Sequence, residues 1–351
     1  MKRNILNKGS IGILSLILAV SLVACSQGTA QITLEDTESA VVTEAIPVIT
    51  ADQPATEISV SPSTVILATS PESDQGIVTT VQTTLDSLAQ ESGLAVKTTE
   101  NLTPESLTAD IKAVVGIGPG LDIAGWSAQF PGIQFVAIGV PGVAGSDNLS
   151  VIGDPAIDSE RITFMAGYLA ALISADYKTG GLFPSNIDRS NEMINSFVVG
   201  VRFFCGICQP KYPPYNSFPQ WQTLPVENAA NGFQTTVDVL VNSGVEILYI
   251  QGELLSPEIL DYLSGVNIKI ISDGHPESIS DNWAGTLQLD PAPGLKNIWS
   301  NVVDGTGGRQ EPASIVLTDL DAGLISEGRY QMFEEMLSDL DAGIISVEPT
   351  P

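Results

Sequence analysis

Short apolar runs and longer amphipathic stretches alternate along this chain from residue 64 onward. Residues 64–69 form an apolar, β-branched run that predicts a strand, and residues 76–91 carry apolar side chains at helical spacing. Further strands are expected at 112–117, 134–140, 179–183, 246–251 and 268–273, and further helices at 122–130, 160–174, 187–204, 229–243 and 257–264. Strands separated by helices of this length indicate βαβ units and parallel sheets. The fold class expected is therefore α/β, with two doubly wound parallel-sheet lobes.

The first 24 residues have the pattern of a secretory signal. A basic tip with Lys2, Arg3 and Lys8 precedes an apolar segment at 11–24. This apolar segment is shorter than the roughly 20 residues that a membrane-spanning helix needs. Residues 1–24 are therefore interpreted as a signal peptide.

The sequence Leu22-Val23-Ala24-Cys25 closes this segment. It resembles the bacterial lipobox, in which the cysteine is lipidated and becomes the first mature residue. An ordinary role for Cys25 in a plain signal peptide is the alternative. The lipobox interpretation places the mature chain on the extracytoplasmic face of the cell membrane, anchored through lipid on Cys25.

Residues 25–61 are interpreted as a flexible acidic linker. From residue 26 they are rich in Thr, Glu, Ala, Val and Pro, and their hydrophobic positions show no sustained helical or strand period. The alternative is an additional strand at 40–42 or 48–49.

The charge of the chain excludes two classes of partner. Its 41 acidic and 14 basic residues give a net charge of −27, and no Lys or Arg occurs between Lys8 and Lys97. Such a chain repels nucleic acid and anionic lipid head groups, so nucleic acid is not an expected partner. The sign could favour a cationic ligand, although an acidic surface commonly serves solubility. A monomer is expected.

Candidate ligand contacts follow from the rule that open parallel sheets bind ligands beyond the carboxyl ends of their strands. The turns after the expected strands contain Gly, Pro and short polar residues, which expose backbone amides to a small polar ligand. The alternative is that they are only tight βα turns. The candidate contacts are Ser73, Asp74, Gly118, Asn186, Gly252, Asp273 and His275. Trp283 is a further candidate, either stacked on a planar ligand or packed beneath the lobe connection.

Enzymatic chemistry finds little support. His275 is the single histidine, and no suitable cluster of Cys or His residues accompanies it to bind a metal. No local motif indicates a Ser-His-Asp triad. Neither a metal nor another cofactor is expected.

Cys205 and Cys208 form a Cys-x-x-Cys pair in a chain expected to be exported. Thiol-disulfide exchange favours a cysteine at a helix N-terminus, whereas this pair follows the helix expected at 187–204. A structural disulfide is therefore the preferred interpretation. Exchange chemistry is the alternative.

An Asp-x-Asp-x-Gly element occurs twice, at 319–323 and at 339–343. It has the first part of a calcium-loop pattern, but the further ligands and the terminal Glu of an EF-hand are absent. Coincidence or local duplication is favoured over paired metal sites.

Three stretches carry a family resemblance. Residues 116–124 read Gly-Ile-Gly-Pro-Gly-Leu-Asp-Ile-Ala, and residues 130–138 read Phe-Pro-Gly-Ile-Gln-Phe-Val-Ala-Ile. Residues 160–172 read Glu-Arg-Ile-Thr-Phe-Met-Ala-Gly-Tyr-Leu-Ala-Ala-Leu. These stretches resemble the basic-membrane-protein family of lipoprotein substrate-binding proteins, and the similarity covers roughly residues 62–348.

The resemblance implies a type I periplasmic-binding-protein fold with two lobes joined by crossover strands. Lobe 1 would comprise 62–154 plus 286–312, and lobe 2 would comprise 155–285 plus 313–348. Characterised relatives bind purine nucleosides, and Asp273 lies where the family places an acidic residue that binds ribose hydroxyls. The loop at 70–76 departs from the family pattern because it lacks the Phe and Asn that hold the base.

The expected function is that of a membrane-anchored solute-binding protein of an ABC importer. It would bind a small polar ligand, with a nucleoside as one candidate, and deliver it to the permease subunits. A ligand-sensing module for a partner receptor is the alternative, and a thiol oxidoreductase using Cys205 and Cys208 is a less favoured one.

Overall fold

The computed structural model of the protein describes residues 63–347. The signal peptide, Cys25 and the linker predicted above lie outside these described residues. In the described part of the chain, no helix combines the length and apolar character needed to cross a membrane.

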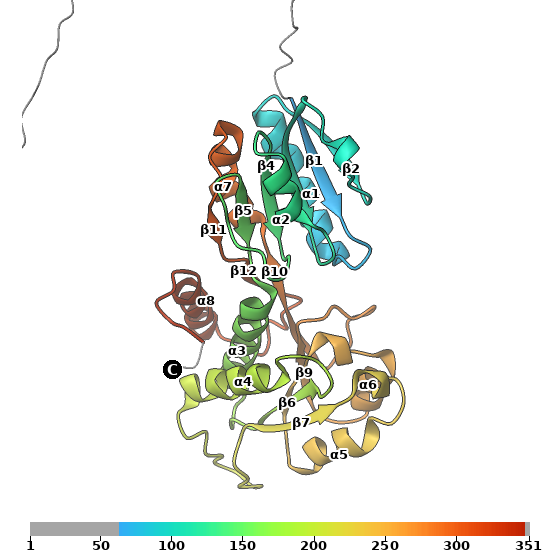
Figure 1. The fold of residues 1–351 in the computed structure, drawn as a ribbon. Helices are drawn as coiled ribbons and strands as arrows, with labels where there is room; N and C mark the ends of the chain where they lie inside the picture. Colours follow the sequence, from blue (N-terminus) through green and yellow to red (C-terminus); the bar gives the residue numbers. More distant parts are fainter. Residues whose placement is uncertain (1–62, 348–351) are drawn as a thin grey trace, which may run out of the picture. The chain divides into compact units, whose positions relative to one another are not determined.

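Residues 63–347 form two six-stranded sheets (Figure 1). The first has the order β11-β5-β4-β3-β1-β2, and all its pairs are parallel. Its strands are β1 (Thr64–Thr69), β2 (Ala95–Thr99), β3 (Ile111–Ile117), β4 (Gln134–Ile138), β5 (Leu149–Ile152) and β11 (Gln310–Glu311).

The second sheet has the order β12-β10-β9-β8-β6-β7, in which only β12 pairs antiparallel with its neighbour. Its strands are β6 (Thr179–Pro184), β7 (Gln220–Leu224), β8 (Ile247–Ile250), β9 (Lys269–Ser272), β10 (Trp283–Asp290) and β12 (Ser314–Thr318). The predicted α/β class with two mainly parallel sheets is confirmed.

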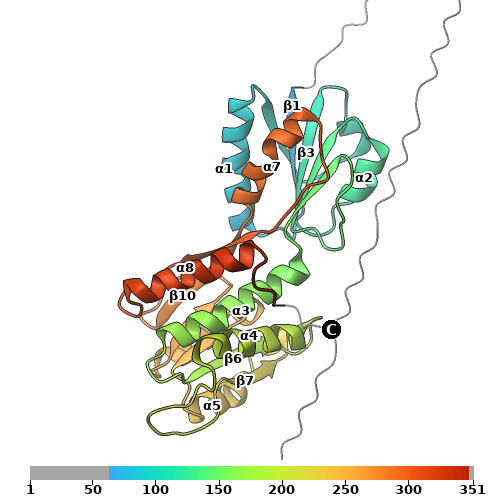
Figure 2. The same ribbon diagram turned by 90° about the vertical axis from the view of Figure 1, so that its left-hand side faces the viewer.

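Helices cover both faces of each sheet. On the first sheet, α1 (Gln75–Glu91) and α7 (Ala292–Asp304) lie side by side on one face, and α2 (Ile123–Gln129) lies on the other (Figure 2). On the second, α3 (Pro155–Ile173), α4 (Ser190–Cys205) and α8 (Glu327–Asp341) share one apolar core. The opposite face packs against α5 (Gln234–Asn242) and α6 (Pro257–Ser264). Burial on both faces explains why the central strands are continuous apolar runs.

Local signals account for some element bounds. The strand at Thr64–Thr69 and the helix at Pro257–Ser264 have the bounds predicted from sequence. The helix predicted at 160–174 begins earlier, at Pro155, because the Asp154 side chain accepts a hydrogen bond from the Ala156 N–H at 3.0 Å. Proline is favoured at the first helical position, since it has no N–H to satisfy there.

The chain passes between the two sheets after β5, after β10 and after β11. The second passage differs from the boundary predicted at residue 286. Residues 286–290 of β10 pair with β12 in the second sheet, so the segment that returns to the first sheet begins at Pro291. The boundary moves because the second half of β10 reads Leu-Gln-Leu-Asp, and this alternation of apolar and polar residues gave no continuous apolar run.

Helices α3 and α4 approach each other closely at two glycines. A Cβ atom on Gly167 would overlap the backbone carbonyl of Phe197, and one on Gly200 would overlap the backbone carbonyl of Phe164. Only glycine permits this separation, because the obstructing atoms belong to the opposite backbone and not to a movable side chain.

Candidate functional site

A cavity lies between the start of α1, which packs on the first sheet, and residues at the carboxyl ends of β9 and β10 in the second sheet. Its volume is about 740 Å³, which falls in the range of small-molecule sites. We call it the main cavity. It is lined by Asp74, Gln75, Gly76, Ile77, Thr80, Ser159, Ile162, Asp273, Gly274, His275, Gln288, Leu289, Asp290, Val316 and Thr318.

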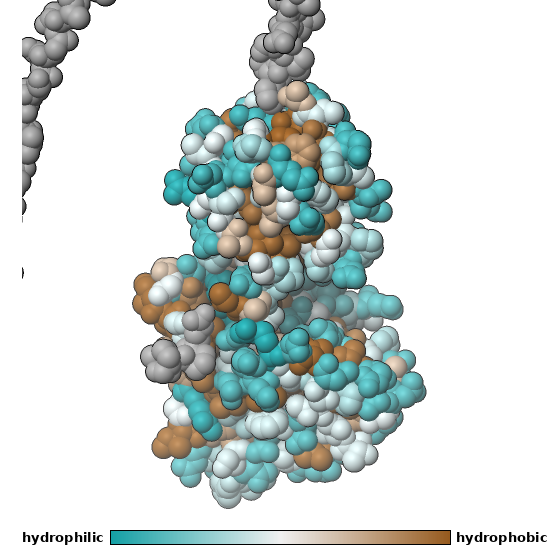
Figure 3. Space-filling view, viewed as in Figure 1, coloured by the Kyte–Doolittle hydropathy of each residue, from teal (hydrophilic) through white to brown (hydrophobic). Residues whose placement is uncertain are grey.

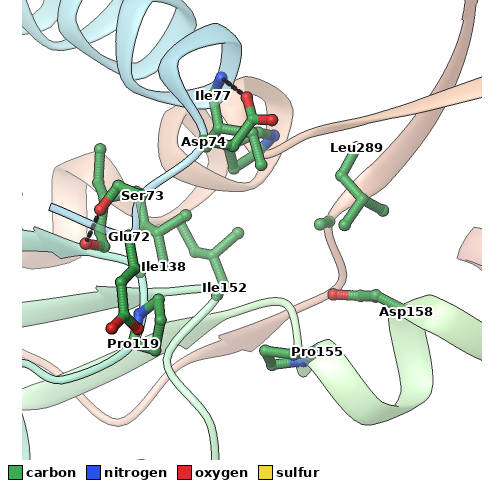
Figure 4. A pocket seen from close by; sticks show the side chains of 15 residues that line it. Glu72, Ser73, Asp74, Ile77, Pro119, Ile138, Ile152, Pro155, Asp158 and Leu289 are labelled. Atoms are coloured by element: carbon green, nitrogen blue, oxygen red, sulfur yellow. Dashed lines mark hydrogen bonds between the residues drawn. The ribbon is translucent and has the colours of Figure 1, made fainter. Parts of the chain in front are cut away.

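A smaller cavity of about 210 Å³ adjoins it at the passages between the sheets (Figure 4). We call it the hinge cavity. Its walls are mostly apolar and include Ile138, Ile152 and Leu289, whereas Asp158 from the first turn of α3 faces the space. Asp74, Ile77 and Leu289 line both cavities. The smaller space therefore extends the main cavity toward the segments that join the lobes.

Asp158 is a buried carboxyl group at the hinge cavity. Burial raises its pKa to about 6, and the attraction of Arg161 opposes that shift. The Arg161 Nη1 atom lies 3.1 Å from Asp158 Oδ1 and donates a 2.8 Å hydrogen bond to the carbonyl of Ala313, in the third passage between the sheets. Arg161 also pairs with Asp341 of α8. One buried guanidinium thus links three segments that are distant in sequence.

Asp273 follows β9 and lines the main cavity. Its Oδ1 atom accepts a 2.6 Å hydrogen bond from the Gly252 N–H. The backbones of Gly252 and Gly274 are so close that a Cβ on Gly274 would lie 2.9 Å from Gly252 Cα. Two glycines are therefore needed for the close approach that orients this carboxylate.

The environment of Asp273 shifts its titration toward neutrality. Burial raises its pKa to about 6, although the Gly252 N–H and the neighbouring Tyr249 hydroxyl favour the charged form. The Tyr249 side chain in β8 is fully buried, and its hydroxyl has no hydrogen bond of standard geometry in the described chain. Burial and the nearby Asp273 raise the pKa of Tyr249 as well.

His275 is held at the rim of the main cavity by Asp319, which follows β12. Asp319 Oδ2 lies 3.4 Å from His275 Nδ1 and accepts a 3.0 Å hydrogen bond from the Thr286 hydroxyl. Trp283 Nε1 donates to that same hydroxyl at 3.1 Å. These contacts form a continuous chain from the core to the rim.

Trp283 therefore has a different role from the stacking partner considered above. Its side chain is 2% exposed, packs in the apolar core beside α5 and α6, and lines neither cavity. The ring cannot stack on a ligand without leaving that core. The packing interpretation is the correct one.

The two Asp-x-Asp-x-Gly elements lie in different structural settings, one directly after β12 and the other at the end of α8. Asp321 lies 3.1 Å from Lys269 Nζ and accepts the Gly323 N–H, while Asp341 in α8 pairs with Arg161. The carboxylates thus serve separate protein partners. Among residues 63–347, no group of three or more His, Cys, Asp or Glu side chains is placed to hold a metal ion.

The structure separates the candidate contacts into three sets. Asp74, Asp273 and His275 line the main cavity, and Ser73, Asp74 and Gly118 line the hinge cavity. Asn186, Gly252 and Trp283 line neither.

Asn186 and Gly252 have local structural roles. The Asn186 side chain accepts a hydrogen bond from the Val226 N–H at 3.0 Å and donates one to Glu227 at 2.9 Å, so it joins two loops. Gly252 orients Asp273 through its backbone N–H, which donates a hydrogen bond to the carboxylate. Neither residue is placed to touch a solute in the two cavities.

Sequence reasoning missed Asp290 and Gln288 because β10 was not predicted. A signal for Asp290 was present, since Asp290-Pro291 repeats the Asp154-Pro155 pair. Asp290 Oδ1 accepts the Ala292 N–H at 2.9 Å, just as Asp154 accepts that of Ala156. In both cases an aspartate accepts the N–H of the second residue after it, at the start of a helix where the chain passes from one sheet to the other.

Cys205 and Cys208 are joined by a disulfide at the C-terminal end of α4. The negative end of a helix dipole disfavours a thiolate there. Neither cysteine lines the main cavity or the hinge cavity. The geometry thus offers no support for thiol exchange on a solute bound in these cavities.

Asp273→Asn is expected to stabilise the protein at neutral pH. The folded-state pKa of about 6 exceeds the ordinary value of 3.8, so ionising Asp273 costs stability as the pH rises through this window. We expect the variant to gain about 1–2 kcal/mol at pH 7.5 and roughly half as much at pH 5. Urea unfolding at both pH values measures the difference. A loss of stability at pH 7.5 would contradict the burial argument.

Comparison with known proteins identifies the fold and leaves the family open. No family model matches the chain, and no curated protein matches it. Among solved structures, an ABC transporter solute-binding protein from Conexibacter woesei DSM 14684 matches with a TM-score of 0.58 and 15% identity, covering 82% of this chain and 98% of its own.

Two further structures have the same fold. An ABC transporter solute-binding protein from Aeropyrum pernix K1 has a TM-score of 0.54 and 15% identity, covering 83% of this chain and 94% of its own. A transcriptional activator of the comK gene from Bacillus halodurans has a TM-score of 0.54 and 11% identity, with coverage of 81% and 99%. The chain has the two-lobed fold of type I periplasmic binding proteins.

Proposed function

We propose that this chain is the extracytoplasmic solute-binding protein of an ABC importer and binds a small polar ligand in the main cavity. The observation that carries the proposal is the cavity itself, which takes Asp74 from one lobe and Asp273 and His275 from the other. A solute in contact with both sides would favour the closed arrangement of the lobes. Its binding energy then supplies the bias between open and closed forms.

The anchor completes the proposal. Lipid on Cys25 would hold the receptor at the membrane. Residues 26–61 would form the linker between this anchor and the folded part. An importer needs its receptor near the permease subunits. The two solute-binding proteins that share this fold support such a role.

A sensing role is the second candidate. The Bacillus halodurans structure of the same fold is described as a transcriptional activator, so the fold also occurs outside transport. In that case the chain would report its ligand to a partner receptor without import. Uptake of the bound solute by cells, with and without this chain, separates the two roles.

The ligand implied by the family resemblance is a nucleoside. The lining of the main cavity contains no Phe, Tyr or Trp, so His275 is the one ring placed there to contact a base. Nucleosides therefore belong in a binding screen beside sugars, amino-acid derivatives and amines.

The test is a thermal-shift screen of these solutes against the full chain purified in detergent. A ligand that binds only the native state raises the melting temperature, by an amount that grows with its concentration relative to Kd. We expect at least one solute to do so, and Asp273→Asn to abolish its effect. Asp86→Asn is the matched control, because Asp86 is exposed on α1 and lines neither cavity. If no solute shifts the wild type, solute binding by this cavity is refuted.

A further inference from the structure

We propose that the solute is a small cation with an aliphatic body, such as an amine, held between the carboxylates of the main cavity. This inference rests on the proposed solute-binding function and assigns the chemical class of the ligand.

Apart from His275, the ionisable side chains that line the main cavity are all acidic. Asp74, Asp273 and Asp290 line it. None of the eleven Lys and Arg residues between 63 and 347 lines it or the hinge cavity. An anionic solute would therefore meet three carboxylates with no Lys or Arg in the lining to offset them.

Backbone hydrogen bonds orient all three carboxylates. Oδ1 of Asp74 accepts the Ile77 N–H at 2.9 Å, Oδ1 of Asp290 accepts the Ala292 N–H at 2.9 Å, and Oδ1 of Asp273 accepts the Gly252 N–H at 2.6 Å. The second oxygens of Asp74 and Asp290 accept no hydrogen bond from the described chain. Pre-oriented acceptors of this kind suit a ligand that carries several N–H donors.

An independent observation marks the Asp273 end of the cavity as incomplete. The Tyr249 hydroxyl is fully buried, makes no hydrogen bond of standard geometry in the described chain, and lies next to Asp273, the residue that lines the cavity. Buried hydroxyls without a partner are rare in native proteins. A donor-rich solute that engages Asp273 and turns its carboxylate would let this hydroxyl donate to it, which completes the network.

The rest of the lining describes the body of the ligand. Ile77, Ile162, Leu289 and Val316 supply aliphatic contact, and no Phe, Tyr or Trp is present for a planar base to stack on. Methylene groups between or beside the charged ends match these walls. Hydrophilic residues also cover much of the face seen in Figure 3, and the net charge of −27 raises the local concentration of cations.

The experiment compares three compounds that share a five-carbon skeleton. Cadaverine is dicationic, 1,5-pentanediol is neutral and glutarate is anionic, so they differ mainly in the charge of their ends. Spermidine and adenosine extend the series to a longer cation and a neutral planar solute. Binding to the full chain in detergent is measured by isothermal titration calorimetry at low and high salt.

We expect cadaverine or spermidine to bind at least tenfold more tightly than pentanediol or adenosine, and glutarate to show no binding. Asp273→Asn and Asp290→Asn should each weaken the cation by at least tenfold. Asparagine caps helices as well as aspartate does, so Asp290→Asn keeps the start of α7. Asp86→Asn should leave the affinity unchanged.

The outcomes separate the two proposals. Equal or tighter binding of a neutral or anionic compound, weakened by Asp273→Asn, would keep the cavity as a solute site and overturn the cationic class. Equal weakening by Asp86→Asn would show that cations bind only the acidic surface, which also overturns it. Failure of every compound to bind at millimolar concentration would overturn the cationic class alone, because the solute-binding function is tested by the wider thermal-shift screen.

Discussion

Replacing Gly200 by alanine is expected to lower the free energy of unfolding by about 3 kcal/mol, the upper end of the usual cost of overpacking. The added methyl group would overlap the Phe164 carbonyl of α3, and Gly167 meets the Phe197 carbonyl in the reciprocal way. Neither helix can yield locally, because α3 is buried and α4 packs one face against it in the largest apolar core of the second lobe. The two helices must therefore move apart and lose contacts along their length.

Urea unfolding followed by circular dichroism measures this loss. The matched control is Gly328→Ala in the first turn of α8, where a Cβ would meet no atom within 4 Å. The control should be neutral or gain up to about 1 kcal/mol, since alanine loses less backbone entropy than glycine in a helix. If Gly200→Ala were as benign as Gly328→Ala, the close packing of α3 on α4 would be wrong.

Arg161→Met is expected to cost about 3–5 kcal/mol, because it leaves the buried Asp158 without its charged partner. The arginine side chain is 7% exposed and that of Asp158 is 3% exposed. Methionine keeps the aliphatic volume but removes every hydrogen bond to Asp158, Ala313 and Asp341. The loss thus measures the ion pair and its links rather than a cavity.

The pH dependence gives this prediction a sign. The pKa of Asp158 in the folded protein, about 6, is already above its ordinary value of 3.8. Without Arg161 it rises further, so the penalty grows as the pH increases and shrinks as Asp158 takes up a proton. The destabilisation by Arg161→Met should therefore be larger at pH 8 than at pH 5.

Two further variants complete the measurement. Lys97→Met is the matched control, because the Lys97–Asp110 pair spans 3.8 Å with the lysine side chain 64% exposed; we expect a change within about 0.5 kcal/mol. The double variant Asp158→Asn/Arg161→Met should recover part of the loss, since it no longer buries an unpaired charge. Equal effects of Arg161→Met and Lys97→Met would show that the buried pair contributes nothing beyond a surface pair.

The glycine packing also explains part of the motif that carries the family resemblance. Ala166, Gly167 and Tyr168 belong to its most specific stretch, and Gly167 lies at the crossing with α4. Tyr168 contacts the rings of Phe203 and Phe204 in α4. Part of the motif is therefore explained by the packing of two helices, and this part gives no information about the solute.

Three of the strands that sequence reasoning missed share a physical cause. Strands β2 and β7 lie at the edges of their sheets and are largely polar, so they lack the apolar run that marked the central strands. The second half of β10, Leu-Gln-Leu-Asp, alternates apolar and polar residues and also lacks a continuous apolar run. By contrast α7 had a readable helical period in Leu295, Ile298, Trp299 and Val302, and could have been predicted.

The sequence by itself determined the class of the fold and the ends of strands at which a site would form. Strands buried on both faces must be apolar throughout, and parallel sheets place their ligands at the carboxyl ends. Only the tertiary structure decided which polar groups meet. Asp74 and Asp273 are about two hundred residues apart and belong to different lobes, so no local period relates them. It also assigned Trp283 to the core and Asp290 to the cavity, because burial depends on packing between distant elements rather than on the residue type.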